Sequence, residues 1–435
     1  MKLEMAKFPV RDVKFGAQTS YRSGTLLINK DELIALVLED KRVESADMEV
    51  AFPGEQTRIV KVRDAVEPRV KVSGASCVFP GIMGPVETAG EGRDHTLPGV
   101  TVMASAEYRP TVLSGTFAQN AGLVDMWGLG AQLTPFGSTI NAVLKFKLID
   151  GVTELEAHAA IQLAEMKVAR RLAETTLELV PEEVETFELA PADPSLPKVI
   201  YIMGLLTMWH EPHSSFAYYG LPIRESLPTF VHPNELLDGA VTEDARRGGG
   251  LRPTTWALMN SAVVRELLRQ HGKQLNFLGV ILQRTRYETE FGKHVNAAGT
   301  SQMAKLLGAD GIIITRISSS GSNYMDVILT VQACEKKGIK TVFLTPEWGG
   351  KEGTELPLVY YVPEASAIVS TGSFERDIPL TAPAKVIGVG NTDQVQVFMG
   401  DKPFSPHDKV TLPASFLFFG GVDWFGTQNL TRTQY

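Results

Sequence analysis

The chain has 435 residues, of which 42 are basic and 50 acidic, giving a formal net charge of −8. It contains no basic run that would follow a phosphate backbone, which argues against a nucleic acid partner. No apolar run approaches the roughly 20 residues that span a bilayer, so we expect a cytoplasmic protein with no membrane partner. The two cysteines, Cys77 and Cys334, are too few for a disulfide framework and are expected to be reduced.

Residues 1–150 are predicted to form a β-rich N-terminal domain. Polar or turn-forming residues separate short apolar runs such as TLLINK, ALVLED, MEVAFP and RIVKV, a pattern that favours strands. After residue 150 the run LEAHAAIQLAEMKVARRLAETTLEL is rich in Ala, Leu and Glu, with apolar residues at helical spacing. We therefore predict a long helix and a proline-rich linker over 151–197.

Residues 198–383 are predicted to form an open, mostly parallel, Rossmann-like α/β domain. The predicted strands are KVIYIMGLL, PTFVH, LNFLGVIL, GIIITRI and KTVFLT. The predicted helices between them are VVRELLRQHG, NAAGTSQMAKLLGA and YMDVILTVQACEKKG. Such alternation favours a parallel sheet with helices on both faces, and ligands bind such sheets at the loops beyond the carboxyl ends of the strands.

Residues 384–435 are predicted to form an extended C-terminal arm. Glycines and aromatic residues interleave in SFLFFGGVDWFGTQNLTRTQY without a helical period. An arm without a core of its own would leave an apolar patch exposed, and such patches usually mark interfaces. We therefore interpret this segment as an arm that covers another surface, for example that of a partner subunit, since Phe416, Phe418, Phe419, Trp424 and Phe425 have no obvious core of their own.

The predicted strand-end loops hold the candidate catalytic residues, which are His210, His213 and His232, three of the eight histidines. With a pKa near neutrality, each could act as a general acid that protonates a departing amine. Alternatively, the three histidines with Glu211 or Glu235 could hold zinc, although their spacing matches no established zinc signature. A third interpretation is structural, with the imidazoles packed against neighbouring aromatic residues.

The run ARRGGGLRP contains the candidate substrate-binding arginines Arg246, Arg247 and Arg252. Glycines make such a loop flexible, and arginine side chains match the geometry of a carboxylate. We group Glu211 and Glu235 with these arginines as substrate-binding residues, and we predict that the three histidines converge on one pocket beside this loop. The alternative is a solvated, glycine-rich surface loop.

Several motifs, taken in chain order, resemble those of one known family. They are VFPGIMGPVETAGEGRDH (78–95), VDMWGLGAQLTPFGST (124–139), MGLLTMWHEPHSSFAYYG (203–220) and LPTFVHPNELLDGAVTEDARRGGGLRPTTW (227–256). This order is similar to that of component B of the glycine, sarcosine and betaine reductases. No one motif is diagnostic, but their ordered occurrence is specific.

The resemblance implies a subunit of an oxidoreductase complex that reductively cleaves a C–N bond of a small amino- or ammonium-carboxylate. It also implies a larger partner subunit that bears a cysteine or selenocysteine, whose thiol or selenol attacks the α-carbon. The alternative function is a metal-assisted hydrolase or lyase of a small nitrogen compound that reuses the fold. A scaffold that only completes the partner's site is a third, non-enzymatic possibility.

The resembled family is made as a proprotein, which is cut before a cysteine that becomes a pyruvoyl group. In this chain the aligned residues 242–245 read Thr-Glu-Asp-Ala, so we expect no pyruvoyl group and no cut. Serine is the precursor in other pyruvoyl enzymes, but the nearest Asn-Ser step, Asn260-Ser261, is interpreted as a helix cap. We predict no cofactor, with zinc as the alternative. Since a quaternary amine cannot condense with a pyruvoyl carbonyl, the missing cysteine points away from glycine as the substrate.

Overall fold

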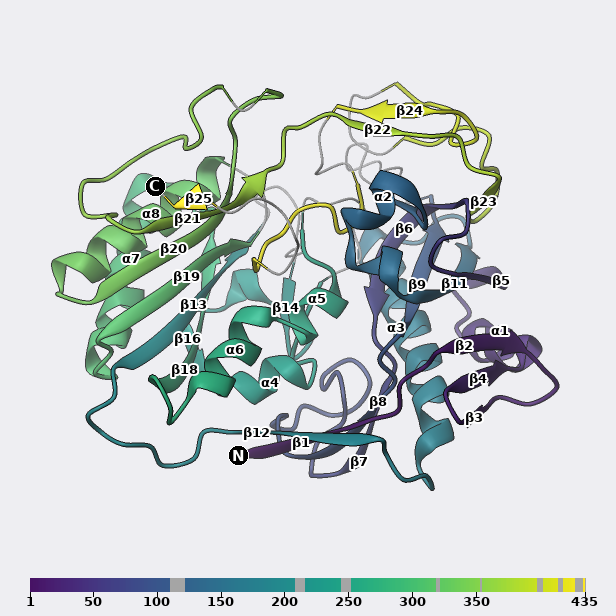
Figure 1. The fold of residues 1–435 in the computed structure, drawn as a ribbon, viewed down its shortest axis with the longest axis horizontal. Coiled ribbons are helices and arrows are strands. Elements are labelled where there is room, and N and C mark those ends of the chain that lie inside the picture. Colours follow the sequence, from purple (N-terminus) through teal and green to yellow (C-terminus); the bar gives the residue numbers. More distant parts are fainter. Residues whose placement is uncertain are drawn as a thin grey trace.

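Two large sheets, one from each half of the chain, dominate the fold (Figure 1). The computed structural model describes residues 1–109, 122–207, 216–243, 252–317, 321–352, 354–396, 402–413, 418–426 and 433–434. Within these ranges, no helix is both long enough and apolar enough to cross a membrane.

The first half contains a six-stranded mixed sheet. Along its path the strands are β10 (Gly122–Asp125), β6 (Thr57–Val66), β9 (Val100–Glu107), β11 (Ile140–Leu148) and β5 (Val43–Ala51), with β23 (Lys385–Ile387) beside β6. A four-stranded sheet lies next to it, in the order β12 (Glu183–Glu188), β1 (Lys2–Lys7), β8 (Gly92–Thr96) and β7 (Arg69–Ser73). Smaller elements are β2 (Asp12–Phe15), β3 (Ser20–Arg22), β4 (Thr25–Ile28), α1 (Lys30–Leu38), α2 (Gly128–Gln132), β22 (Ile378–Leu380) and β24 (Val410–Leu412).

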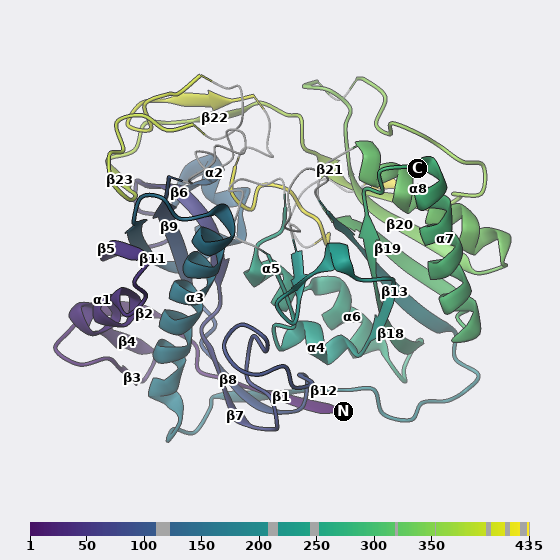
Figure 2. The same cartoon turned by 180° about the vertical axis from the view of Figure 1, so that it is seen from behind.

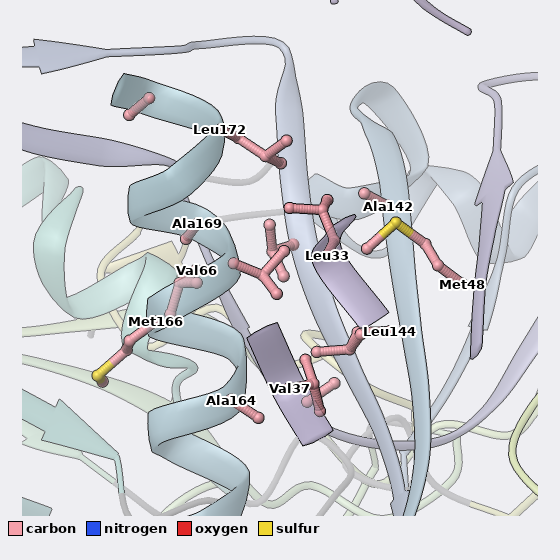
Figure 3. Packing of buried hydrophobic residues seen from close by; sticks show 14 of the residues in the cluster. Leu33, Val37, Met48, Val66, Ala142, Leu144, Ala164, Met166, Ala169 and Leu172 are labelled. Atoms are coloured by element: carbon pink, nitrogen blue, oxygen red, sulfur yellow. The ribbon is translucent and has the colours of Figure 1, made fainter. Parts of the chain in front are cut away.

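The long helix predicted from the Ala-rich run is confirmed as α3 (Glu154–Ala173). Thr153 and Glu156 begin it with a reciprocal capping box, which satisfies backbone N–H groups of the first turn. Its apolar face, including Ala164, Ala169 and Leu172, packs against the sheet and α1 (Figure 3). Alanine side chains let the helix axis approach the strands closely, so α3 is part of the first core.

The second half contains a seven-stranded sheet with helices on both faces (Figures 1 and 2). Its order is β16 (Thr229–Val231), β18 (Asn276–Thr285), β13 (Lys198–Leu206), β19 (Gly311–Ile317), β20 (Lys340–Glu347), β21 (Ile368–Ser373) and β25 (Thr433–Gln434). The pairs from β18 to β21 are parallel, and the two outer pairs are antiparallel. Each predicted strand run therefore lies in this sheet, while the Rossmann-like classification stays a prediction.

The side chains of β13 alternate between two cores. Tyr201 and Met203 face the core that contains α6 (Ala262–Gln270), whereas Ile200 and Ile202 face the core that contains α7 (Glu290–Leu306) and α8 (Gly321–Lys336). This burial on both faces explains why the run is continuously apolar. Ser261 caps α6 by accepting the backbone N–H of Val264, as predicted.

Short elements lie between the two large sheets (Figure 1). They are β14 (Phe216–Tyr218), β15 (Leu221–Pro222), α4 (Pro233–Leu237), β17 (Val241–Glu243) and α5 (Thr255–Met259). They connect the halves, because β14 and β17 pair with each other while α5 contacts β6.

The described aromatic residues of the C-terminal arm pack within the chain itself, so the surface that they cover belongs to this chain and not to a partner subunit. Phe418, Phe419, Trp424 and Phe425 are all buried, whereas Phe416 lies outside the described residues. Phe419 stacks on the ring of Phe136 at a centroid distance of 5.4 Å. Trp424 and Phe425 join the core of the second half. The aromatic side chains of the arm thus pack against both large sheets, whose strands are remote from the arm in sequence.

Candidate functional site

Five of the predicted site residues lie outside the described residues, namely His210, Glu211, His213, Arg246 and Arg247. They fall in segments 208–215 and 244–251, and the described ends of these segments lie close together. Strand pairing places Phe216, which follows the first segment, opposite Glu243, which precedes the second. The predicted convergence of the three histidines stays a prediction.

The other ends of both segments are also held by named contacts. Before the first segment, the backbone N–H of Thr207 donates to the carbonyl of Thr285 at the carboxyl end of β18. After the second segment, Arg252 forms a buried ion pair with Glu243 at 2.6 Å. Arg252 is therefore engaged with a protein carboxylate, and its predicted substrate-binding role stays a prediction. The described residues that flank the first segment thus lie at the carboxyl edge of the parallel sheet and on β14, and β17 ends directly before the second segment.

His232 and Glu235 form a capping box at the N-terminus of α4. Nδ1 of His232 accepts the backbone N–H of Asn234 at 3.2 Å, and Glu235 accepts the backbone N–H of His232 at 2.9 Å. The other oxygen of Glu235 accepts the hydroxyls of Tyr218 and Tyr219 at 2.8 and 2.9 Å. Burial lowers the pKa of His232 to about 4, so its imidazole is neutral at pH 7. These contacts favour a positioning role, and the catalytic and substrate-binding roles stay predictions.

A buried hydrogen-bond network joins the β17–α5 region to the first half. Asp64 on β6 accepts both the backbone N–H and the hydroxyl of Thr255. The Thr255 hydroxyl in turn accepts the backbone N–H of Glu243 at 3.1 Å, and the Gln162 amide donates to the Glu243 carbonyl. The residues that flank segment 244–251 are therefore held from two elements of the first half, β6 and α3.

Glu165 on α3 and Asp64 on β6 are both fully buried and their carboxyl groups interact electrostatically, while among the described residues neither oxygen of Glu165 has a hydrogen-bond partner. Burial raises the pKa of Asp64 to about 6. Burial, followed by repulsion from Asp64, raises the pKa of Glu165 well above its usual range. When Glu165 is protonated, the pair therefore avoids burying two negative charges.

A buried guanidinium lies at the carboxyl edge of the parallel sheet. Arg316, near the end of β19, is fully buried; its Nε donates to the Thr345 hydroxyl at 3.2 Å and its Nη2 donates to the Pro346 carbonyl at 2.9 Å. The guanidinium carbon lies 4.4 Å from the ring centroid of Trp348 and 5.5 Å from that of Tyr324. In the part of the chain that the structure describes, Nη1 of Arg316 and the hydroxyl of Tyr324 have no hydrogen-bond partner.

The electrostatics of Arg316 suit an anionic ligand. No carboxylate of the described residues forms an ion pair with it. Burial lowers the pKa of Arg316 to about 9, so the side chain is still cationic at pH 7. An unpaired buried cation costs several kcal/mol, and a carboxylate matches the fork of N–H donors. The position also suits a ligand, since open parallel sheets bind ligands at this edge.

Sequence reasoning missed Arg316, although a signal was present. The run GIIITRISSS places one charged residue at the end of an otherwise apolar strand. Charged side chains are rarely fully buried without a partner, so an arginine in such a strand indicates either a partner elsewhere in the fold or a ligand.

The zinc alternative depends on residues that lie largely outside the described ranges. Among the residues that the structure describes, no three His, Cys, Asp or Glu side chains are grouped so that they could hold a metal ion. Since His210, Glu211 and His213 are not among them, the zinc site stays a prediction.

Comparisons with known proteins cover nearly the whole chain. A family model described as glycine/sarcosine/betaine reductase component B subunits matches residues 1–410. The chain is 34% identical over 408 residues to glycine reductase complex component B subunits alpha and beta of Acetoanaerobium sticklandii, covering 92% of each chain. It is 33% identical over 412 residues to sarcosine reductase complex component B subunit alpha of Peptoclostridium acidaminophilum, again with 92% of each covered. It is 34% identical over 398 residues to the betaine reductase counterpart from that organism, covering 89% of this chain and 88% of the relative. No solved structure matches the chain.

Proposed function

The chain belongs to the family of glycine/sarcosine/betaine reductase component B subunits, and from this premise we propose that it binds the substrate of a reductase complex. The proposed substrate is a small ammonium-carboxylate whose C–N bond is cleaved reductively. The proposed partner is a larger subunit that bears the nucleophilic cysteine or selenocysteine. The relatives are named as reductase components, which does not favour the metal-assisted hydrolase or lyase.

The buried guanidinium of Arg316 is the observation that supports this substrate class. Glycine, sarcosine and betaine, after which the relatives are named, differ at nitrogen but share a carboxylate on the reacting carbon. We propose that Arg316 pairs with this carboxylate, while the Tyr324 hydroxyl offers a further donor. Anchoring the carboxylate would orient the α-carbon for attack by the partner's thiolate or selenolate.

The residues of this chain do not fit a pyruvoyl group. Between Glu243 and Pro253 there is no serine, threonine or cysteine that could attack the preceding carbonyl. Thr242 is buried on β17, and elimination from threonine would give a ketobutyryl group. Cys334 is buried within α8, and Cys77 precedes α3 in the first half. We therefore propose that the chain works without a pyruvoyl carbonyl.

A quaternary ammonium substrate is consistent with that absence. When a thiolate or selenolate attacks the α-carbon, the new C–S or C–Se bond forms as the C–N bond breaks, and the nitrogen takes the bonding pair. A quaternary nitrogen leaves as a neutral tertiary amine, and because it has no N–H it cannot condense with a carbonyl, so a site without a pyruvoyl group loses no assistance toward such a substrate. We therefore propose a trimethylammonium carboxylate in preference to glycine.

Co-expression with the larger subunit tests the proposed function. We expect the purified pair, supplied with a dithiol reductant, to release amine from betaine at least 10-fold faster than from glycine, because cleavage of a primary amine would lose the assistance of a carbonyl that a quaternary nitrogen cannot use. Amine release is measured by gas chromatography, and a partner whose nucleophilic residue is replaced by alanine is the control. Release by this chain alone, or by the pair with the alanine variant, would contradict the proposal.

Intact-mass spectrometry tests whether the chain is cut. We expect one species near 47.5 kDa that does not react with hydrazines, since residues 243–253 hold no precursor for a carbonyl. Two fragments, the smaller carrying a hydrazine-reactive carbonyl, would contradict this expectation and restore a mechanism in which the amine condenses with a carbonyl.

A further inference from the structure

Helix α7 has its large apolar residues on the outside. Phe291 and Leu306 are each 78% exposed and Val295 is 55% exposed, and their spacing places them on one face of the helix. The inner face buries small or polar residues instead, namely Asn296, Ala297, Thr300, Ser301 and Ala304. A surface helix usually buries its large apolar residues and exposes its polar ones, and α7 does the opposite. In both views α7 lies at the outer edge of the molecule (Figures 1 and 2). The outer face therefore has the composition of an interface.

The residues at the midpoint of this face are small, and the exposed Gln302 follows one turn later. Ala298 and Gly299 are both exposed, and a Cβ added to Gly299 would meet nothing within 4 Å. The fold of this chain therefore does not require glycine at that position. Small residues flanked by bulky ones allow the backbone of a second helix to approach closely at the centre while Phe291 and Leu306 pack at the ends.

The charges beside this face favour a second copy of α7 in the antiparallel orientation. Glu290 lies at the N-terminal end, 89% exposed and 3.8 Å from the imidazole of the half-exposed His294, and the exposed Lys305 lies near the C-terminal end. An antiparallel copy of α7 would place each Glu290 beside the partner's Lys305. It would also oppose the two helix dipoles, whereas a parallel copy would bring like charges together. The face is therefore complementary to itself.

We propose that two copies of this chain associate through α7, antiparallel, about a twofold axis near Ala298 and Gly299. Phe291 then packs against the partner's Leu306 at both ends of the contact, as an isologous interface requires. This proposal does not depend on the proposed function, because it uses a surface outside the candidate site.

Light scattering coupled to size-exclusion chromatography tests the association, with the wild-type chain expected at twice 47.5 kDa. Phe291→Glu and Leu306→Glu are each expected to raise the dimer dissociation constant about 30-fold, the equivalent of about 2 kcal/mol for a central contact. Leu227→Glu is the matched control, because Leu227 is 79% exposed on a different surface, and it should leave the dimer unchanged. Circular dichroism checks that every variant is folded.

Charge reversal separates this geometry from other dimers. Glu290→Lys and Lys305→Glu should each weaken the dimer, and the double variant should restore it, although the reversed charges oppose the dipole of each helix. In addition, Ala298→Cys should form an intermolecular disulfide on mild oxidation because it lies at the axis. Phe291→Cys, equally accessible but far from its symmetry mate, should not. A monomeric wild-type chain, a dimer insensitive to these changes, or a face that binds only the larger subunit would overturn the proposal.

Discussion

Replacing Arg316 with methionine is expected to abolish binding of the carboxylate substrate, with a loss in affinity of about 100-fold or more. Arg316 is the buried cation whose Nη1 has no acceptor among the described residues. Removing one member of a buried charge pair typically costs 2–5 kcal/mol of binding free energy. Calorimetric titration with betaine measures the loss. Choline, which has the same ammonium group but no carboxylate, should bind neither the wild-type chain nor the variant.

The same substitution should leave the fold intact, because methionine replaces an uncompensated buried charge with an apolar side chain. Arg58 offers a matched control in the first half. It is equally buried but makes a bidentate ion pair with Asp125 at 2.7 and 2.9 Å. Arg58→Met should therefore cost about 3–5 kcal/mol of unfolding free energy, because it leaves the Asp125 carboxylate buried without its cationic partner. If Arg316→Met destabilised the chain as much as Arg58→Met, or bound betaine normally, Arg316 would be a structural residue.

Replacing Asp64 with alanine is expected to reduce the free energy of unfolding by about 3–5 kcal/mol at pH 7. The change leaves the backbone N–H and the hydroxyl of Thr255 without their acceptor, because both donate to Asp64. It also removes the carboxyl group that lies beside Glu165. Urea denaturation followed by circular dichroism measures the loss. Asp150→Ala is the control at an exposed position and should change stability by less than about 0.5 kcal/mol.

Glu165→Gln should act in the opposite direction, and its effect should depend on pH. The folded-state pKa values of both carboxyls are raised, so the folded chain retains protons that the unfolded chain releases. Stability from the pair is therefore fully present below about pH 4 and falls as the pH rises through about 6, where Asp64 titrates. Glutamine can donate to Asp64 without titrating. The variant should match the wild type near pH 4 and exceed its stability at pH 8 by an amount on the order of 1–3 kcal/mol. An equal effect at both pH values would show that Glu165 does not hold the proton.

Periodicity was sufficient to predict β13 and α3 because it reports local burial, but the short run ALVLED was predicted as a strand and instead lies at the end of helix α1. Alternate residues of β13 point to opposite faces of the sheet, and both sets are apolar. The run that forms α3 repeats its alanines at helical spacing. Neither pattern depends on which distant segment completes the core. The surface on which the C-terminal arm packs was not predictable, for the converse reason. Phe419 has no periodic context, and its stacking partner Phe136 lies almost 300 residues away in the chain.

The candidate site was only partly accessible to sequence reasoning. The strand-end loops stay a predicted site, and the buried Arg316 lies near the same edge of the sheet. Histidines were chosen because the imidazole has a pKa near neutrality. His232, however, accepts a backbone N–H, and burial lowers its pKa to about 4. That shift arises from desolvation, which one-dimensional spacing does not encode.

The sequence by itself determined the family, through motifs in a specific order, and the lack of a pyruvoyl precursor between Glu243 and Pro253. Both are properties of residue identity, which needs no coordinates. Only the tertiary structure decided that Arg316 is a buried cation without a carboxylate partner among the described residues, and that burial and the neighbouring Asp64 carboxyl group raise the pKa of Glu165. Burial and ion pairing depend on the distance between side chains that chain folding brings together, and the energies of charged groups depend steeply on both.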